Sequence, residues 1–401
     1  MSSTTEDQPM TSSLPEHHAS AFGQLVTGPP GAGKSTYCHG MYQVSIEAFD
    51  GANRQFLTAL GRPVKVINLD PAVTDPPYPC AVSITELITL QEVMDEYGLG
   101  PNGAMLYCME YLEENFDWLL NRLDEVLAGE GGNGYIIIDT PGQAELWTNH
   151  DSLKHIIQKL QKLDYRLAAV HLTDAHAITD PSKYIAAVLL ALRAMLQLEM
   201  PHINVLSKID TIGGFGELPF NLEYYTQVQD LGYLLQTLQD QPRAGGKKMK
   251  KLNEAMVELI EDFSLVGFET LAVEDKQSMM HLVRVIDKAT GYIFVPLDGS
   301  TTDDNMHALF STAARPMDYD VNDVQERYSA ENKEAYDKFQ EEQWEKEWAA
   351  RHQAEAIKKA MLGQQAPQEG DAAEHDNADA QENPRSGRVQ IRPRDFSDEI
   401  D

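Results

Sequence analysis

A glycine-rich motif directly after a short apolar run constrains this chain more than any other feature. Residues 28–35 read GPPGAGKS, match G-x4-G-K-[ST], follow the apolar run 22–27 and precede a helical pattern. In this context glycines let backbone N–H groups converge on phosphate oxygens, and the helix N-terminus adds partial positive charge. The motif therefore predicts a phosphate-binding loop between a strand and a helix, in preference to a chance glycine turn.

Each residue of this loop has a predicted role in holding a nucleotide with Mg2+. Lys34 is expected to reach the β- and γ-phosphates, and the hydroxyl of Ser35 to ligate Mg2+. Thr36 is expected to add a contact to the α-phosphate. The remaining phosphate-binding positions are Gly31, Ala32 and Gly33.

The first 300 residues alternate between apolar, β-branched runs and helical patterns. Five further strands are predicted at 64–69, 135–139, 167–172, 203–206 and 268–273. Such runs suit strands buried on both faces of a sheet. Helical patterns lie between them, for example at 184–198 and 252–263, whereas 231–246 is predicted to be an insertion or a break between helices. We therefore predict an α/β fold with a doubly wound, mostly parallel sheet of the P-loop NTPase kind.

Composition divides the chain into a nucleotide domain and its flanks. We predict a disordered N-terminus at 1–20, a nucleotide-hydrolysing domain at 21–300, an acidic segment at 301–362 and a disordered acidic tail at 363–401. Residues 301–401 hold 24 acidic and 12 basic residues. A long charged helix is predicted at 323–362, with Trp344 and Trp348 four residues apart on one of its faces.

The charge balance excludes several classes of partner. The net charge of −31 results from 32 Lys and Arg against 63 Asp and Glu, so direct binding to nucleic acid or to an anionic membrane is disfavoured. Three scattered cysteines do not predict a disulfide framework or a zinc site. The chain shows neither a signal-peptide pattern nor an apolar run long enough for a membrane span. We expect a soluble, cytoplasmic or nuclear protein.

Two further strand ends carry carboxylates that suit a magnesium site. Asp139, at the end of one predicted strand, is expected to bind Mg2+ through water, and Gly142 to place a backbone N–H near the γ-phosphate. Asp70 ends another strand in NLDPA and is predicted to hold a magnesium-bound water or to polarise the attacking water. For Asp70 the alternative is an Asx turn before Pro71.

A fourth strand end indicates which base is read. Ser207-Lys208-Ile-Asp210 fits the [NTS]-K-x-D pattern, in which Asp210 accepts from guanine N1–H and from the exocyclic amine, and Lys208 lies along the base. Ala272 and Val273, after the next predicted strand, are expected to offer the guanine oxygen a backbone donor. The expected ligands are therefore GTP and Mg2+.

Taken together, these segments resemble the GPN-loop GTPases, a family of the SIMIBI-like P-loop class. The resemblance runs in order over 22–295 through GPPGAGKST, NLDPA, LGPNGAMLYCMEYLEEN, DTPGQAELWT, TDPSKYI and MPHINVLSKID. FNLEYYT and ELIEDFSLVGFETLAVEDKQSM resemble the type-2 members most. The resemblance implies a GTP-hydrolysing domain with helical insertions that forms a homodimer or a heterodimer with paralogues.

The resemblance also implies roles that the residues alone do not reveal. The loop Gly100-Pro101-Asn102 would enter the active site of the partner subunit, with Asn102 near the γ-phosphate. Gln143 and Glu145, with Asp70, would order the attacking water. The implied biological role is assembly and nuclear import of RNA polymerase II, and of polymerase III as an extension, through contacts with polymerase subunits or assembly factors. A cytoplasmic protein that shuttles to the nucleus would fit this role.

Some features depart from the family or leave alternatives open. An extra stretch near 42–54 and the acidic tail are poorly matched. The motifs contain no arginine finger, although Arg166 and Arg193 stay open for that role, so we expect slow turnover. One alternative is a nucleotide-dependent scaffold or assembly chaperone with dispensable hydrolysis. The other is a dimeric SIMIBI-type ATPase, which would carry a lysine where this chain has Pro29.

Overall fold

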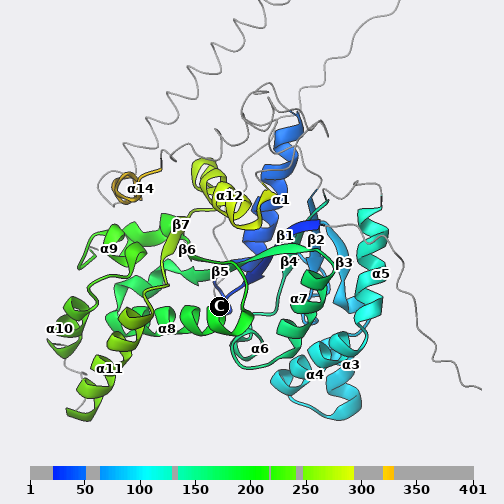
Figure 1. Ribbon diagram of the computed structural model, residues 1–401, viewed down its shortest axis with the longest axis horizontal. Coiled ribbons are helices and arrows are strands. Elements are labelled where there is room, and N and C mark those ends of the chain that lie inside the picture. The colour runs from blue at the N-terminus through cyan, green and yellow to red at the C-terminus, as the bar shows by residue number, and fades with distance from the viewer. Residues whose placement is uncertain are drawn as a thin grey trace, which may run out of the picture. The chain divides into compact units, whose positions relative to one another are not determined.

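The sheet at the centre of the fold is parallel throughout. The computed structural model describes residues 21–50, 64–128, 134–215, 218–240, 247–292 and 319–328. Within these residues, seven parallel strands pair in the order β3-β2-β4-β1-β5-β6-β7 (Figure 1). The strands are β1 (Ala21–Thr27), β2 (Val64–Asn68), β3 (Cys80–Ser83), β4 (Gly134–Asp139), β5 (Arg166–Asp174), β6 (His202–Ser207) and β7 (Phe268–Leu271).

Helices cover both faces of this sheet because successive strand residues point to opposite sides. Val26 packs with α1 (Lys34–Asp50) and α12 (Lys276–Thr290) on one face, and its neighbour Leu25 belongs to the core of the other face. Figure 1 shows α1 and α12 above the sheet and α6 and α8 below it. The helices that supply the core of that second face include α4 (Pro101–Glu114), α5 (Phe116–Leu127), α6 (Ala144–Thr148), α7 (Ser152–Lys162), α8 (Pro181–Leu198), α10 (Gly232–Asp240) and α11 (Lys247–Phe263).

Short elements connect these layers. The structure contains η1 (Ile84–Glu86), α3 (Leu90–Tyr97), η2 (Ala175–Thr179), η3 (Ile209–Phe215), α9 (Leu222–Gln227) and α14 (Val321–Tyr328). None of the described helices is both long and apolar enough to cross a membrane. The doubly wound parallel sheet predicted from the sequence is confirmed.

One local prediction differs from the structure, and two others concern segments that lie partly outside the described residues. The stretch 231–246 was predicted to be an insertion or a break, but its described part forms α10 from Gly232 to Asp240 because Leu234 and Leu238 are buried there. Helix α1 continues through 42–50 without interruption, and 51–54 lie outside the described residues. The predicted helix at 323–362 is described only as far as Tyr328, so Trp344 and Trp348 also lie outside.

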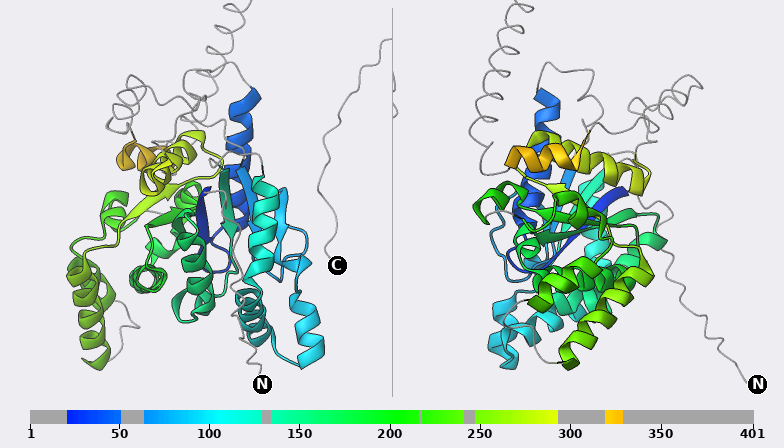
Figure 2. Two further views of the ribbon diagram at one scale, coloured as in Figure 1. Left: turned by 45° about the vertical axis from the view of Figure 1, so that its right-hand side comes forward. Right: turned by 90° about the vertical axis from the view of Figure 1, so that its left-hand side faces the viewer.

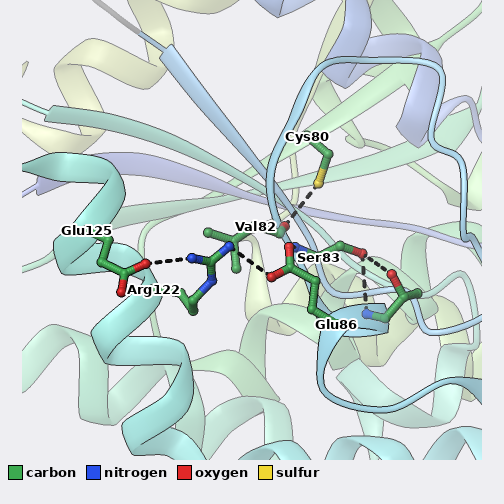
Figure 3. Close-up of polar contacts among 7 residues, drawn as sticks. Cys80, Val82, Ser83, Glu86, Arg122 and Glu125 are labelled. Carbon is green, nitrogen blue, oxygen red and sulfur yellow. Dashed lines mark hydrogen bonds and ion pairs between the residues drawn. The ribbon is translucent and has the colours of Figure 1, made fainter.

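The edge strand β3 was not predicted. Its four residues pair with β2 alone, and only Val82 is fully buried, so the apolar signal is too short to recognise. A capping box joins Ser83 to Glu86 at the start of η1. Arg122 of α5 lies between Glu86 and Glu125, with 2.9 Å between its guanidinium and the Glu86 carboxylate, and so ties the edge to α5 (Figure 3).

The register of the strands brings the predicted motifs to one edge of the sheet. Val26 and Asn68 both pair with Asp139, and Asp174 pairs with Ser207. Because all the strands run in the same direction, the loops after β1, β2, β4, β6 and β7 leave at their carboxyl ends. In open α/β sheets this edge is where ligands bind.

A candidate nucleotide-binding site

The loop between β1 and α1 has the backbone conformation that a phosphate cradle requires. Gly28, Gly31 and Gly33 have φ of 142°, 80° and 89°, a region that favours glycine. A side chain on Gly28 would also place its Cβ 2.4 Å from the Leu172 carbonyl oxygen. The loop therefore needs glycine at these positions, because all three have positive φ and because Gly28 also lies close to another strand.

Lys34 folds back over this loop. Its ammonium donates to the carbonyl oxygens of Gly28 at 3.0 Å and Pro29 at 3.4 Å. Burial lowers the pKa of Lys34, while the nearby charges of Asp139 and Asp70 act in the opposite direction. A buried cation held over the loop by weak neutral acceptors is ready to pair with phosphate oxygens, which are stronger acceptors.

Asp139 is held at the bottom of the site by two hydroxyl groups. Its Oδ2 accepts from Tyr78 at 2.8 Å and from Ser35 at 3.1 Å. Its Oδ1 is buried and has no hydrogen-bond partner among the described residues. Burial raises the pKa of Asp139, whereas the hydroxyls of Tyr78 and Ser35 and the charge of Lys34 lower it.

These residues fit a hydrated magnesium ion. A buried carboxylate oxygen without a partner is costly and calls for a cation or its water as ligand. The hydroxyl of Ser35 is close to this carboxylate, and both are hard oxygen donors of the kind Mg2+ prefers. Among the described residues, no group of three or more His, Cys, Asp or Glu side chains is placed to hold a metal ion by itself. The ion would therefore take its other ligands from phosphate and water, as Mg2+ usually does.

Asp70 faces the same site from the end of β2. Its carboxylate accepts from the backbone N–H of Ala72 at 2.9 Å, so the Asx turn considered as an alternative is present. Burial raises the pKa of Asp70, opposed by that N–H and by the charge of Lys34. The Asx turn is compatible with a role of Asp70 in the site, because the Ala72 N–H contacts only Oδ1 of the carboxylate.

The segment after β4 approaches the phosphate loop closely. A Cβ on Gly142 would lie 2.9 Å from Lys34 Nζ and 3.3 Å from Pro30 Cα, so only glycine fits here without displacing Lys34. Gln143 is the N-cap residue of α6, and Glu145 lies exposed in its first turn. Gln143 and Glu145, which are predicted to order the attacking water, therefore lie at the start of a helix. This helix directly follows the close approach of Gly142 to Lys34.

Tyr78 also belongs to the candidate site, although the sequence did not predict it. It lies in the irregular segment between β2 and β3, where no motif marks it, yet it is buried and contacts Asp139. Burial and then the charge of Asp139 raise the pKa of Tyr78, so its hydroxyl stays protonated and donates. Tyr78 stands between prolines in the segment PPYPC, and nothing there distinguishes it from an ordinary tyrosine.

Replacing Tyr78 with Phe should weaken magnesium binding without a change in side-chain volume. Without the hydrogen bond from Tyr78, the pKa of Asp139 should rise further. Asp139 would then become protonated at a higher pH than in the wild type. We expect Mg2+ affinity to fall roughly 3- to 10-fold and the acid limb of the hydrolysis profile to move to higher pH. Tyr107→Phe, which removes an exposed tyrosine hydroxyl bonded to that of Tyr97, is the control, and equal magnesium titrations for the two variants would contradict this role.

The SKID segment packs directly on the phosphate loop. The Ser207 hydroxyl is 2.7 Å from the Ala32 carbonyl oxygen and 3.2 Å from that of Thr173. Lys208 has φ of 59°, and its ammonium pairs with Asp174 at 2.8 Å. Asp210 lies in the first turn of η3. Ser207 therefore connects the predicted base-reading segment to the predicted phosphate-binding segment through one hydrogen bond.

The backbone donor predicted at Ala272 is already engaged within the protein. The Ala272 N–H donates to the buried hydroxyl of Ser278 at 3.1 Å, and that hydroxyl lies 3.2 Å from the Thr270 carbonyl oxygen. A guanine oxygen would have to displace this contact. Of the two residues predicted here, we therefore expect Val273 to provide the donor.

The GPN segment begins a helix and lies on the surface. Gly98 ends α3 in a left-handed conformation, Gly100 is the N-cap residue of α4, and Pro101 occupies its first turn, where proline needs no N–H partner. The segment therefore forms the junction between two helices. Asn102 is exposed, and the structure gives it no contact with the phosphate loop of its own chain. The three residues thus stay apart from the site that the other motifs form.

The two arginines left open as fingers lie in other places. Arg166 is the first residue of β5 and pairs with Phe22, so it lies at the amino ends of the strands, opposite the phosphate loop. Arg193 is exposed on α8, with its guanidinium 3.5 Å from the Asn149 amide oxygen. Neither contacts Lys34 or Asp139 in the structure.

The site has the parts of a P-loop nucleotide-binding protein, with a buried carboxylate beside the loop. Comparisons with known proteins agree with this class. A family model described as a conserved hypothetical ATP binding protein matches residues 26–292. GPN-loop GTPase QQT1 of Arabidopsis thaliana is 48% identical over 311 residues, which are 77% of this chain and 97% of that protein.

Relatives from animals and fungi carry the same family name. GPN-loop GTPase 2 of Danio rerio is 47% identical and matches 73% of this chain and 86% of its own length. That of Saccharomyces cerevisiae is 45% identical, with 80% and 88% covered. The chain therefore belongs to the GPN-loop GTPase family. Among solved structures, a GTPase in apo form from Pyrococcus abyssi shares the fold, with a TM-score of 0.50, 23% identity, and 67% of this chain and 97% of that chain covered.

Proposed function

We propose that this chain is a magnesium-dependent, GTP-hydrolysing switch that acts as a dimer. The observation that carries the proposal is the hydrogen bond from Ser207 to the Ala32 carbonyl oxygen, which fixes a guanine-reading segment against a phosphate loop. Membership in a family whose relatives are named GTPases supports hydrolysis as the reaction.

The residues of the site support this reaction by positioning and by charge. Lys34 would leave the Gly28 carbonyl and pair with the β- and γ-phosphates. Ser35 and Asp139 would hold Mg2+, directly and through water, with Asp70 beside them; when bound, the ion neutralises charge on the phosphates. Asp70, Gln143 and Glu145 would orient the attacking water, since phosphoryl transfer needs an aligned nucleophile more than a strong base.

Guanine is favoured over adenine although the matching family model is described as ATP-binding. Asp210 offers a carboxylate that guanine N1–H and its amine can both satisfy, and adenine lacks that pair of donors. The chain also has Pro29 where the alternative ATPase class carries a lysine. The base-reading segment is therefore the feature that decides between the two nucleotides.

Competition between nucleotides tests this proposal. We expect GTP and GDP to bind at least about 10²-fold more tightly than ATP and ADP, because adenine would leave the Asp210 carboxylate unpaired. Removal of Mg2+ with EDTA should stop hydrolysis and leave some GDP binding. ATP binding equal to GTP binding, or hydrolysis that survives chelation, would contradict the proposal.

A second copy would complete the site. Asn102 is exposed at the start of α4, and neither Arg166 nor Arg193 contacts the phosphate loop, so the chain provides no finger of its own from these positions. The family resemblance places the GPN loop in the partner's site, and an inserted amide is a neutral group that stabilises charge less than an arginine would. We therefore expect slow turnover, either as a homodimer or with a paralogue.

The cellular role that the family suggests is assembly and nuclear import of RNA polymerase II, with polymerase III as an extension. The strongly acidic surface would meet polymerase subunits or assembly factors instead of the nucleic-acid template. A cytoplasmic protein that shuttles to the nucleus fits this role. Affinity purification with and without a non-hydrolysable GTP analogue tests it: polymerase subunits should be captured in a nucleotide-dependent way, and their absence in both states would contradict it.

A further inference from the structure

Helix α14, near the C-terminal end of the described residues, packs against the base-reading side of the site. Val324 is 2% exposed and belongs to the same core as Ile209 and Ala272. The helix contacts α9 and η3, the element that carries Asp210. Figure 2 shows α14, in orange, beside α12.

Arg327 of α14 makes a forked contact with the start of α12. One guanidinium nitrogen is 2.7 Å from Asp275 Oδ2 and another is 3.0 Å from Gln277 Oε1. The two charged side chains are only 12% and 13% exposed, so this is a largely desolvated ion pair. Such pairs are sensitive to the loss of one partner, which leaves the other charge buried and uncompensated.

Asp275 is also the residue that closes the loop after β7. Its backbone N–H donates to the Ala272 carbonyl oxygen at 3.1 Å, and its carboxylate accepts from the Gln277 N–H as the N-cap of α12. Asp275 therefore closes this turn with its backbone N–H and pairs with Arg327 through its carboxylate.

Tyr319, at the other end of the segment 319–328, also contacts the connection between β7 and α12. The hydroxyl of Tyr319 is 2.9 Å from that of Thr270, the strand residue two positions before Ala272. Tyr319 also stacks on His281 of α12, with ring centroids 4.1 Å apart. The segment 319–328 thus contacts the β7–α12 connection on both sides of the turn. The hydrogen bonds of Tyr319 and Arg327 join residues 49 and 52 positions apart in the sequence.

We propose that Arg327 is a positioning residue for nucleotide binding: by holding Asp275 it fixes the turn Ala272–Asp275 where Val273 meets the base. The proposal rests on the guanine-binding function proposed above, and it assigns the segment after the nucleotide domain a part in that function. The phosphate side of the site is independent of this contact, because Lys34, Ser35 and Asp139 are held by the β1 and β4 loops and by Tyr78.

The consequence is a selective effect on the base. Without Arg327 the turn loses the contact that holds the Asp275 carboxylate from α14, so it opens more often and guanine leaves sooner. We expect Arg327→Ala to raise the GDP dissociation rate and the KM for GTP about tenfold, a typical coupling between two linked contacts. The kcat at saturating GTP should change by much less.

The experiment compares base-side and phosphate-side ligands on full-length protein. Dissociation of a fluorescent GDP analogue reports the base loop, and binding of magnesium tripolyphosphate, which has no base, reports the phosphate loop. Arg327→Lys keeps the charge but loses the fork, so it should restore part of the affinity. Arg122→Ala is the matched control, because that arginine of α5 also joins two acceptors, Glu86 of η1 and Glu125 of its own helix, away from the turn after β7 (Figure 3).

Asp275→Asn keeps an oxygen for the α12 cap and removes the charge, so it tests the same pair if Arg327→Ala does not fold. The double variant should be no weaker than Arg327→Ala alone, because both changes remove one interaction. Equal loss of tripolyphosphate and GDP binding, or unchanged GDP dissociation in folded Arg327→Ala, would overturn the proposal. A wild-type protein without guanine preference would instead contradict the proposed function, so the two failures are distinguishable.

Discussion

Replacing Lys34 with Met should abolish most GTP hydrolysis while leaving the nucleotide-free protein at least as stable as before. The ammonium is the group that would meet the β- and γ-phosphates, and loss of such a clamp costs about 10²–10³-fold in kcat. In the absence of nucleotide the same charge is unfavourable, since burial lowers the pKa of Lys34 in spite of Asp139 and Asp70. We expect the free energy of unfolding to stay equal or to rise by up to about 1 kcal/mol.

The sign of this effect has a pH dependence. A lysine whose pKa is lowered in the folded state destabilises the fold while it is protonated, and this cost disappears as the pH rises toward the ordinary value of 10.5. The stability difference between wild type and variant should therefore shrink in alkaline solution. Lys154→Met, which removes the surface pair with Glu199 at 2.9 Å, is the control and should retain full hydrolysis. A marked loss of thermal stability in Lys34→Met would contradict the claim that the buried charge of Lys34 destabilises the nucleotide-free protein.

Replacing Asn102 with Ala should lower GTP hydrolysis on the order of 10²-fold and leave GTP affinity nearly unchanged. The reason is that Asn102 is exposed at the start of α4 and is proposed to enter the site of the other subunit, so its loss should affect hydrolysis there and leave the phosphate loop of its own chain intact. Single-turnover hydrolysis and nucleotide affinity, measured above the dimerisation concentration, separate the two quantities.

The control for Asn102 is Glu114→Ala, at the opposite end of the same helix and also exposed. It should not alter hydrolysis. Size-exclusion chromatography must show that Asn102→Ala still dimerises, since otherwise the loss reflects assembly. Unchanged hydrolysis by dimeric Asn102→Ala would contradict a role for this residue in the partner's site.

The sheet was predictable because its central strands are buried on both faces. Runs such as 135–138 are apolar throughout. The structure extends four of the six predicted strands by one or two residues at their ends, whereas the strands predicted at 64–69 and 268–273 end at Asn68 and Leu271. The edge strand β3 was not predictable, since its short run has a single buried side chain, Val82. Helix α10 was obscured by the Pro and Gly residues that follow it in the sequence.

The contiguous parts of the site were also predictable, because Lys34, Asp139 and Ser207 lie in motifs whose spacing follows from phosphate and base chemistry. Tyr78 and Arg327 were not. Each acts through one contact with a residue far along the chain, Asp139 at a separation of 61 and Asp275 at 52. Such pairs depend on the tertiary fold, and a single sequence carries no trace of them.

The most direct test of a GTPase whose site is completed by a second copy is to mix two inactive variants. Lys34→Met would lack the phosphate clamp but still present Asn102, and Asn102→Ala would have the reverse defect. After subunit exchange at equal amounts, about half of the dimers are mixed and each contains one complete site, so activity should return to about a quarter of the wild-type value. A mixture no more active than the sum of the two variants, with exchange demonstrated, would contradict completion of the site in trans.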